Sequence, residues 1–197
     1  MIDATLKGQN QLVRQILKKD NSPNERDSQG ETALTWASHF GHTSIVKDLL
    51  AIGADREAYG NTLKGTPLLL AARGGHRGIV ALLAVLANLN AHNQHGQTAL
   101  MLAVEPSDEK YKPQHRILAT VDLLIQAGAD LDLRDFTGNT ALMWAVRWGN
   151  HEVTQRLLAA GANPNFKNDH GQTALQLADD QGLTKIVSLL NTVGAFD

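Results

Sequence analysis

The same short pattern recurs five times along this 197-residue chain. Each copy runs from a glycine-containing turn through a threonine into a short apolar stretch, and a second apolar stretch follows it. The copies begin QGETALTWASHFGH, LKGTPLLLAARGGH, QHGQTALMLAVEP, FTGNTALMWAVRWGN and DHGQTALQLADDQG. Their anchor threonines, which lie 34, 32, 42 and 33 residues apart, are Thr32, Thr66, Thr98, Thr140 and Thr173. Self-similarity at such a period is the signature of a repeat architecture, and it constrains the fold more than any other feature.

Each copy predicts a pair of short helices. A threonine hydroxyl can accept a hydrogen bond from a free amide in the first turn of a helix, so we expect each anchor threonine to cap a first helix. Pro67 suits the first position of such a helix, where its missing N–H costs nothing. A second apolar helix follows and should end at a glycine with left-handed backbone. The glycines expected there are Gly53, Gly128, Gly161 and Gly194.

One pair of short helices is too small to bury its own apolar face, so the pairs must stack. The motif G-x-T-A/P-L-x-x-A, the G-H pairs at 41–42 and 75–76 and the G-A-D/N endings resemble the ankyrin-repeat family over essentially the whole chain. The resemblance implies an all-α ankyrin-repeat solenoid of helix-turn-helix units joined by β-turn or hairpin fingers. We expect a single domain, 1–197, with a partial N-terminal cap (1–26), units at 27–60, 61–92, 93–134 and 135–167, and a C-terminal cap (168–197).

Two units depart from the pattern. In the second unit, Lys64 replaces the turn glycine, and the ending VLANLN has lost one residue and the glycine that should end the helix, which predicts a distorted joint. The third unit carries an insertion at 105–116 between its two helices. Because loops lengthen at little cost, a tolerated surface loop is one interpretation. The other is a partner contact through Tyr111 and Lys112.

The composition excludes several classes of function. The net charge is −2 with no block of five or more like charges, which argues against nucleic acid as the main partner. No apolar run approaches the roughly 18–20 residues that cross a bilayer, so no membrane partner is expected. The chain has no cysteine and no secretory signal at its start. These features favour the cytoplasm, with a periplasmic location or secretion into a host cell as alternatives if a signal was removed or is of a non-standard kind.

Motifs for catalysis are missing from the sequence. No P-loop, dinucleotide fingerprint, metalloprotease helix, calcium loop or serine-hydrolase elbow occurs, so we predict a protein that is not an enzyme and uses no cofactor. Two histidine pairs, His39/His42 and His92/His95, could each supply two metal ligands, but a closed zinc site needs about four. We therefore predict no metal site. A metal or small molecule held by His92 and His95 stays the less favoured alternative.

The family resemblance implies that a partner binds the concave face formed by the fingers and the first helices. We predict a non-catalytic protein-protein interaction module that is monomeric on its own. The alternative is an accessory protector or regulator of a neighbouring enzyme. The residues predicted to contact the partner are His39, Phe40, Arg73, Phe136, Asn139, Arg147 and Trp148.

Two tryptophans of one predicted helix are expected to differ in role. The position of Trp144 is apolar in every unit, which predicts packing between units. The position of Trp148 holds phenylalanine, glycine or glutamine in other units, so the fold does not require a bulky side chain there. Because exposed aromatic side chains are typical of interface hot spots, Trp148 is the leading candidate for a partner contact.

Overall fold

The computed structural model describes residues 1–19, 22–105 and 114–196. In these ranges the secondary structure is helical, and the strand-like features are two isolated backbone bridges, Arg26–Thr32 and His92–Thr98. The prediction of an all-α solenoid is confirmed. The helices are α1 (Ile2–Leu6), α2 (Asn10–Lys19), α3 (Ala33–Phe40), α4 (Thr43–Ala51), α5 (Pro67–Arg73), α6 (Arg77–Leu83), α7 (Ala99–Val104), α8 (Gln114–Gln126), α9 (Ala141–Arg147), α10 (His151–Ala159), α11 (Ala174–Asp180) and α12 (Thr184–Thr192).

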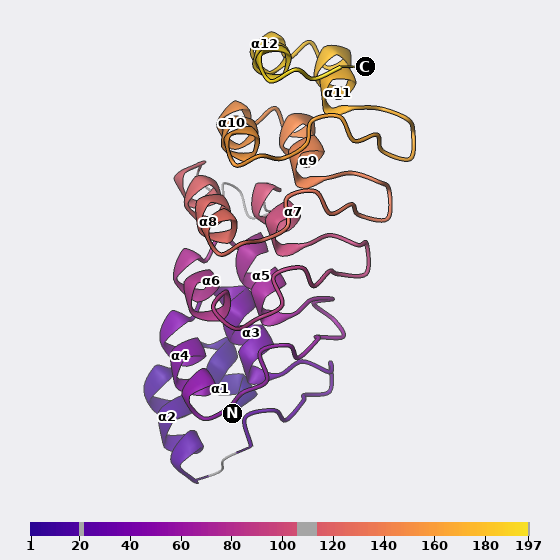
Figure 1. Cartoon of the computed structure of the whole chain (residues 1–197). Coiled ribbons are helices and arrows are strands. Elements are labelled where there is room, and N and C mark those ends of the chain that lie inside the picture. The colour runs from indigo at the N-terminus through magenta and orange to yellow at the C-terminus, as the bar shows by residue number, and fades with distance from the viewer. Residues whose placement is uncertain (20–21, 106–113, 197) are drawn as a thin grey trace.

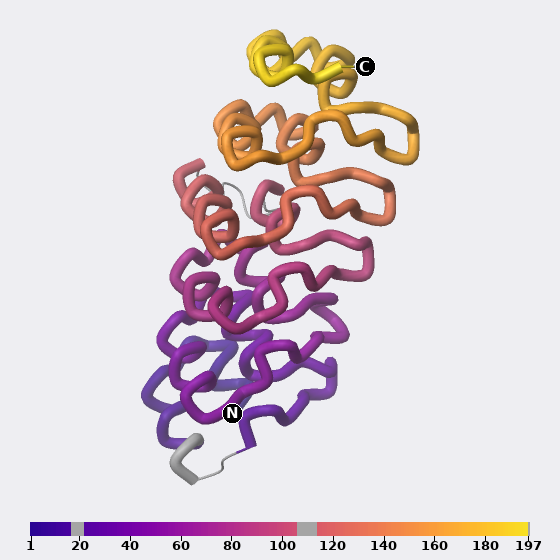
Figure 2. Tube along the Cα trace, in the orientation of Figure 1, coloured from indigo at the N-terminus to yellow at the C-terminus, as the bar shows by residue number. Residues whose placement is uncertain are grey.

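The helices form two rows, and the fingers project beyond one of them (Figure 1). The first helices from α3 to α11 pack side by side, the second helices form the outer row, and the finger loops extend on the far side of the first helices. The chain climbs from one end of the stack to the other without turning back (Figure 2). The main contacts of each helix pair are therefore with the pairs immediately before and after it, as in a quasi-one-dimensional array.

The anchor threonines start the first helices as predicted. The hydroxyl accepts a hydrogen bond from the amide three residues later at Thr32, Thr66, Thr140 and Thr173. Thr98 stands at the same position, but its buried hydroxyl has no partner among the described residues. At Thr32 and Thr173 the cap is reciprocal, because the side chains of Thr35 and Gln176 accept from the amide of the capping threonine. These reciprocal caps satisfy two free amides at each helix start.

The second unit is irregular where the sequence predicts it. Lys64 has a φ of 56°, and no other non-glycine residue in the described ranges has a left-handed backbone. Helix α6 ends at Leu83 without a left-handed glycine, and the next residue, Ala84, keeps right-handed backbone. Val85 and Leu86 are consequently 77% and 71% exposed. The glycines predicted to end the other second helices all have a positive φ: Gly53, Gly128, Gly161 and Gly194.

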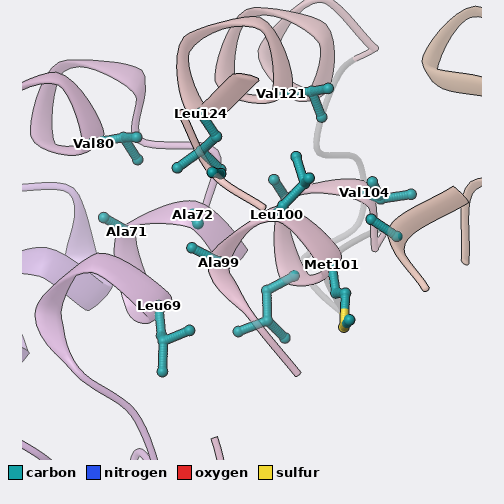
Figure 3. Packing of buried hydrophobic residues seen from close by; sticks show 14 of the residues in the cluster. Leu69, Ala71, Ala72, Val80, Ala99, Leu100, Met101, Val104, Val121 and Leu124 are labelled. Carbon is teal, nitrogen blue, oxygen red and sulfur yellow. The ribbon is translucent and has the colours of Figure 1, made fainter. Parts of the chain in front are cut away.

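The core runs through the stack between the two helix rows. Figure 3 shows Ala72 of α5, Leu100 of α7 and Leu124 of α8 meeting in one apolar interior. The leucines in this set are at most 2% exposed. Burying a leucine side chain contributes about 1.5–3 kcal/mol, so the contacts between units supply much of the stability that no single unit has.

A ladder of hydrogen bonds also joins successive units where the second helices end. In each link a backbone amide donates to a side-chain oxygen of the preceding unit. From the second link on, the acceptor lies two residues after the donor of the previous link, in the same loop. The donor and acceptor pairs are Asp55–Asn24 (2.7 Å), Asn88–Glu57 (2.8 Å), Asp130–Asn90 (3.2 Å), Asn163–Asp132 (2.9 Å) and Phe196–Asn165 (3.1 Å).

The insertion of the third unit separates α7 from α8. Helix α7 ends at Val104, and Glu105 leaves it with extended backbone. Tyr111 and Lys112 lie outside the described residues, so their contact with a partner stays a prediction, as do the unit boundaries. None of the helices in the described part of the chain combines the length and apolar character that a bilayer crossing requires.

Candidate functional site

A hollow of about 450 Å³ lies between the fingers and the first helices of the middle units. We call it the finger groove. Arg73 closes α5, Arg147 closes α9, and Glu105 follows α7, so the three first helices each contribute their last turn to it. The remaining wall comes from the fingers and one aromatic ring. The lining residues are Arg73, His95, Gln97, Glu105, Asp135, Thr137, Asn139, Trp144, Arg147 and His170.

Trp144 and Asp135 organise one wall of the groove. The indole nitrogen of Trp144 donates to Oδ2 of Asp135 at 2.8 Å. Oδ1 of Asp135 accepts from the amide and hydroxyl of Thr137 and from the amide of Asn139. The Arg147 guanidinium lies 5.4 Å from the centre of a Trp144 ring, which is the geometry of a cation–π contact. The carboxylate of Asp135 is therefore committed to the protein's own structure, whereas Arg147 is oriented toward the groove.

An exposed aromatic ring stacks on each finger-bound tryptophan. Trp148 is 46% exposed, and its ring centre lies 6.5 Å from that of Trp144 with 22° between the planes. Three units earlier, Phe40 is 44% exposed and stacks on Trp36 at 5.7 Å and 13°. Trp36, at the same position of the first unit, is buried, but Trp144 is half-buried and lines the groove. The prediction that Trp144 belongs to the interior between units is therefore only partly correct.

Asp27 accepts a hydrogen bond from Trp36 in the same way that Asp135 accepts one from Trp144. Its Oδ2 accepts from the indole nitrogen of Trp36 at 2.7 Å, and its Oδ1 accepts from the amides of Gln29 and Glu31. Burial alone would raise the pKa of Asp27. The hydrogen bonds from Trp36 and from the backbone outweigh that effect and lower the pKa of Asp27 below its ordinary value. The carboxylate is thus held in its charged form as a structural acceptor.

The groove carries two exposed guanidinium groups. Within the described ranges, the ion pairs are Arg14–Asp48, Arg134–Asp169 and Arg156–Asp122, so neither Arg73 nor Arg147 has an ion-pair partner there. Glu105 lies at the matching position of the unit between them, and it is half-buried. Its Oε2 atom is buried with no hydrogen-bond partner among the described residues. Charges of alternating sign therefore follow one another along the groove.

The predicted contact residues fall into separate groups. Arg73 and Arg147 meet in the finger groove, and Trp148 adjoins it through Trp144. His39 and Phe40 lie with Trp36 in the first unit, where the ring centres of His39 and Phe40 are 4.8 Å apart.

Phe136 stands apart from these groups. It is 65% exposed at a finger tip, where it packs edge-to-face against His92. The structure therefore brings together only part of the predicted set.

Asn139, which the sequence predicts as a partner contact, is almost fully buried, and that contact stays a prediction. Its side chain is 3% exposed, donates to the hydroxyl of Thr137 at 2.8 Å and accepts from Asn168 at 3.1 Å. The position just before an anchor threonine faces the interior of the finger stack, and Glu31 and Gln97 are buried there too. Asn139 forms part of the groove wall, but its polar groups are paired with Thr137 of its own finger and Asn168 of the next.

Glu105 and Asp135 belong to the groove although the sequence did not single them out. One signal was present for Glu105, because it lies seven residues after its anchor threonine, as Arg73 and Arg147 do after theirs. The insertion that follows it obscured this match. Asp135 could be related to Asp27 by the repeat, but the hydrogen bond to a tryptophan nine residues later needs the folded finger.

The histidines of the third finger have other partners. His92 contacts the carbonyl of Asn93 at 3.0 Å, and His95 contacts the amide nitrogen of the Gln94 side chain at 3.1 Å. No three histidine, aspartate or glutamate side chains gather as a metal site in the described part of the chain. The alternative of a metal bound by His92 and His95 therefore gains no third ligand from these residues.

Stacked helix pairs with fingers along one edge define a helical-repeat solenoid. Comparison with known proteins shows to which family of helical-repeat solenoids the chain belongs. The family profile described as "Ankyrin repeats (3 copies)" matches residues 1–84 and 114–195, which is most of the chain. The chain belongs to the ankyrin-repeat family, and the resemblance seen in its sequence is confirmed.

Similar solved structures cover nearly the whole chain. An ankyrin repeat domain from Acinetobacter baumannii AYE is 32% identical with a TM-score of 0.85, and the match covers 98% of this chain and 96% of that one. EF0377, an ankyrin repeat protein, is 30% identical with a TM-score of 0.83, over 96% of this chain and 94% of that one.

Curated relatives are much longer than this chain. The ankyrin repeat and KH domain-containing protein mask-1 of Caenorhabditis elegans is 35% identical over 162 residues, or 81% of this chain. Neurogenic locus notch homolog protein 1 of Homo sapiens is 31% identical over 157 residues, or 79%. The chain spans 6% of the length of each, so the activities of those whole proteins are not carried over to it.

Proposed function

We propose that the chain is a non-catalytic module that binds a protein partner across the finger groove, the Trp148 ring beside it and the Phe40 ring of the first unit. Ankyrin repeats are a general protein-protein interaction module, and this chain belongs to that family. The proposal adds to this general role the surface of the chain that contacts the partner. It is supported by the position of the groove, which lies between the fingers and the first helices, and by the residues that line it.

The observation that carries the proposal is the exposure of Phe40 and Trp148. Each ring is close to half exposed, yet each stacks on a tryptophan that is itself hydrogen-bonded to a finger aspartate. An aromatic side chain fixed in this way loses little conformational entropy when it is covered by a partner. Rigid aromatic rings of this kind are the residues that most often dominate binding energy at interfaces.

The experiment compares Phe40→Ala and Trp148→Ala with a matched control. Phe196 is also exposed, at 61%, but it lies at the C-terminal end of the stack, so Phe196→Ala removes an aromatic ring from a different surface. A partner would first be captured on the immobilised chain and identified. Its affinity for the three variants would then be measured by titration calorimetry, with circular dichroism to check that each variant is folded.

We expect Trp148→Ala to weaken binding by about 2 kcal/mol or more, the range of an interface hot spot, while Phe196→Ala leaves the affinity unchanged. Phe40→Ala should weaken it when the partner reaches the first unit. Unchanged affinity in folded Phe40→Ala and Trp148→Ala would refute the proposed surface.

A further inference from the structure

The row of residues seven positions after the anchor threonines gives the finger groove an alternating charge pattern. Arg73, Glu105 and Arg147 occupy this position in three successive units. All three line the same groove, with the glutamate in the unit between the two arginines. A ligand that lies along the groove therefore meets a positive, then a negative, then a positive group.

Both arginines are available to a ligand. They are exposed, and neither has an ion-pair partner within the described ranges. Arg147 rests over the ring of Trp144 at 5.4 Å, and its guanidinium makes no hydrogen bond within the described ranges. A guanidinium edge matches the two oxygens of a carboxylate, and a pre-oriented one loses less freedom on binding.

The acidic groups of the groove form no ion pair with these arginines within the described ranges. The carboxylate of Asp135 accepts hydrogen bonds from Trp144, Thr137 and Asn139 and is buried. Glu105 faces neither arginine within ion-pair distance. A carboxylate placed opposite Glu105 would be repelled, whereas a neutral or basic side chain is tolerated or attracted there.

The fold sets the distance between the two arginines. Helix α7 packs against both α5 and α9, and neighbouring helices pack about 8–10 Å apart. The ends of α5 and α9 are therefore about 16–20 Å apart. Because an extended chain rises about 3.2–3.4 Å per residue, this distance corresponds to about five or six residues.

We propose that the finger groove binds an extended acidic segment of its protein partner. Two carboxylate side chains of that segment, six positions apart, contact Arg73 and Arg147, and the residue opposite Glu105 is neutral or basic. The inference rests on the proposed function and names the chemistry of the partner. Its two arginines are distinct from Phe40 and Trp148, so the two ideas can fail separately.

The test uses short labelled peptides as probes. One has two glutamates six positions apart, with a lysine midway between them and glycine and serine at the other four positions. A second moves the same glutamates to two positions apart, a third replaces them with glutamine, and a fourth replaces the central lysine with glutamate. Binding to the full chain is followed by fluorescence anisotropy at about 150 mM salt, where exposed charges are screened beyond about 8 Å.

We expect the first peptide to bind at least ten times more tightly than each of the other three. Arg73→Gln and Arg147→Gln should each weaken its binding at least fivefold. The control is Arg77→Gln, because Arg77 is an exposed cation on α6 and lies outside the groove. This variant makes the same change in charge and should alter binding less than twofold.

Several results would overturn the inference. The first is equal binding of the first two peptides or an equal effect of Arg77→Gln, since either would mean attraction to overall charge. The second is an absence of binding by the first peptide, and the third is more effective competition by inorganic phosphate or single-stranded DNA at equal concentration. A partner whose affinity falls in Trp148→Ala but not in the two arginine variants would overturn this inference and leave the proposed function standing.

Discussion

The indole nitrogen of Trp36 donates to Oδ2 of Asp27 at 2.7 Å, and the same bond joins Trp144 to Asp135 at 2.8 Å. In both units the aspartate begins the finger and the tryptophan lies in the first helix, nine residues later. The bond therefore fastens the finger to the helix. An exposed aromatic ring stacks on each tryptophan, so the hydrogen bond that holds the tryptophan also fixes the orientation of that exposed ring.

The bond to Trp36 predicts an acid-sensitive contribution to stability. The pKa of Asp27 is lower in the folded chain than its ordinary value, so the ionised carboxylate stabilises the fold. This contribution is fully present above the unfolded pKa of about 3.9 and is lost as the pH falls through the folded value. The difference in unfolding free energy between Asp27→Asn and the natural chain should therefore be constant above about pH 5 and shrink as the pH falls from about 4 through the folded pKa of Asp27. Urea unfolding at several pH values measures this difference.

Trp36→Phe is the companion variant for this prediction, because it keeps an aromatic ring and removes the donor. It should raise the pKa of Asp27, as followed by the NMR chemical shift of the carboxylate during an acid titration. A constant difference in unfolding free energy from pH 3 to pH 7 would contradict the assignment, as would an unchanged pKa in Trp36→Phe.

The left-handed backbone of Lys64 predicts that replacing this residue with glycine stabilises the fold. A left-handed backbone costs a non-glycine residue about 1–2 kcal/mol, and the Lys64 side chain is exposed, so replacing it removes little packing. Glycine adds freedom to the unfolded chain and offsets part of the gain. We expect Lys64→Gly to raise the free energy of unfolding by about 0.5–1 kcal/mol. Thermal and urea unfolding measure it, and Lys64→Ala, which keeps the strain, should show no such gain.

Much of the fold follows from the sequence because the repeat demands it. The threonine before each first helix and the glycine after most second helices have backbone roles that few other residues fill, so their spacing predicts the helix pairs. Even the irregular second unit is visible, since Lys64 stands where the other units have glycine. Thr98 shows the limit, because its place in the repeat predicts a capping bond that the described structure does not form.

The candidate site was less predictable, because it depends on how fingers from different units pack. Asn139 is polar and adjoins a finger turn, so the sequence suggests exposure, but a bond from Asn168 of the next finger holds it inside. Trp144 belongs to an apolar position, yet the groove leaves part of it accessible. The direction of a side chain relative to the neighbouring unit is not carried by the repeat pattern alone.

The stacked core predicts that a core substitution destabilises the neighbouring units more than the distant ones. Leu100 and Leu190 are almost fully buried, and replacing such a leucine with alanine costs about 2–5 kcal/mol. Because units contact mainly their neighbours, Leu190→Ala should speed amide hydrogen exchange in α11 and α12 and leave α3 and α5 unchanged. Leu100→Ala, in the middle of the stack, should speed exchange on both sides. Uniform loss of protection in Leu190→Ala would instead indicate one fully cooperative unit.

The hydrogen-bond ladder predicts a smaller and more local effect. Oδ1 of Asp132 accepts from the amide of Asn163 at 2.9 Å and links the units that contain α8 and α10. Asp132→Ala removes the acceptor, but Asn163 is exposed and water can replace part of the bond. We therefore expect a loss of about 0.5–1.5 kcal/mol in urea unfolding, with faster hydrogen exchange at the Asn163 amide. Asp132→Asn keeps an oxygen in place and should lose less than about 0.5 kcal/mol. If both variants lose the same amount, the charge of Asp132 rather than this bond is responsible.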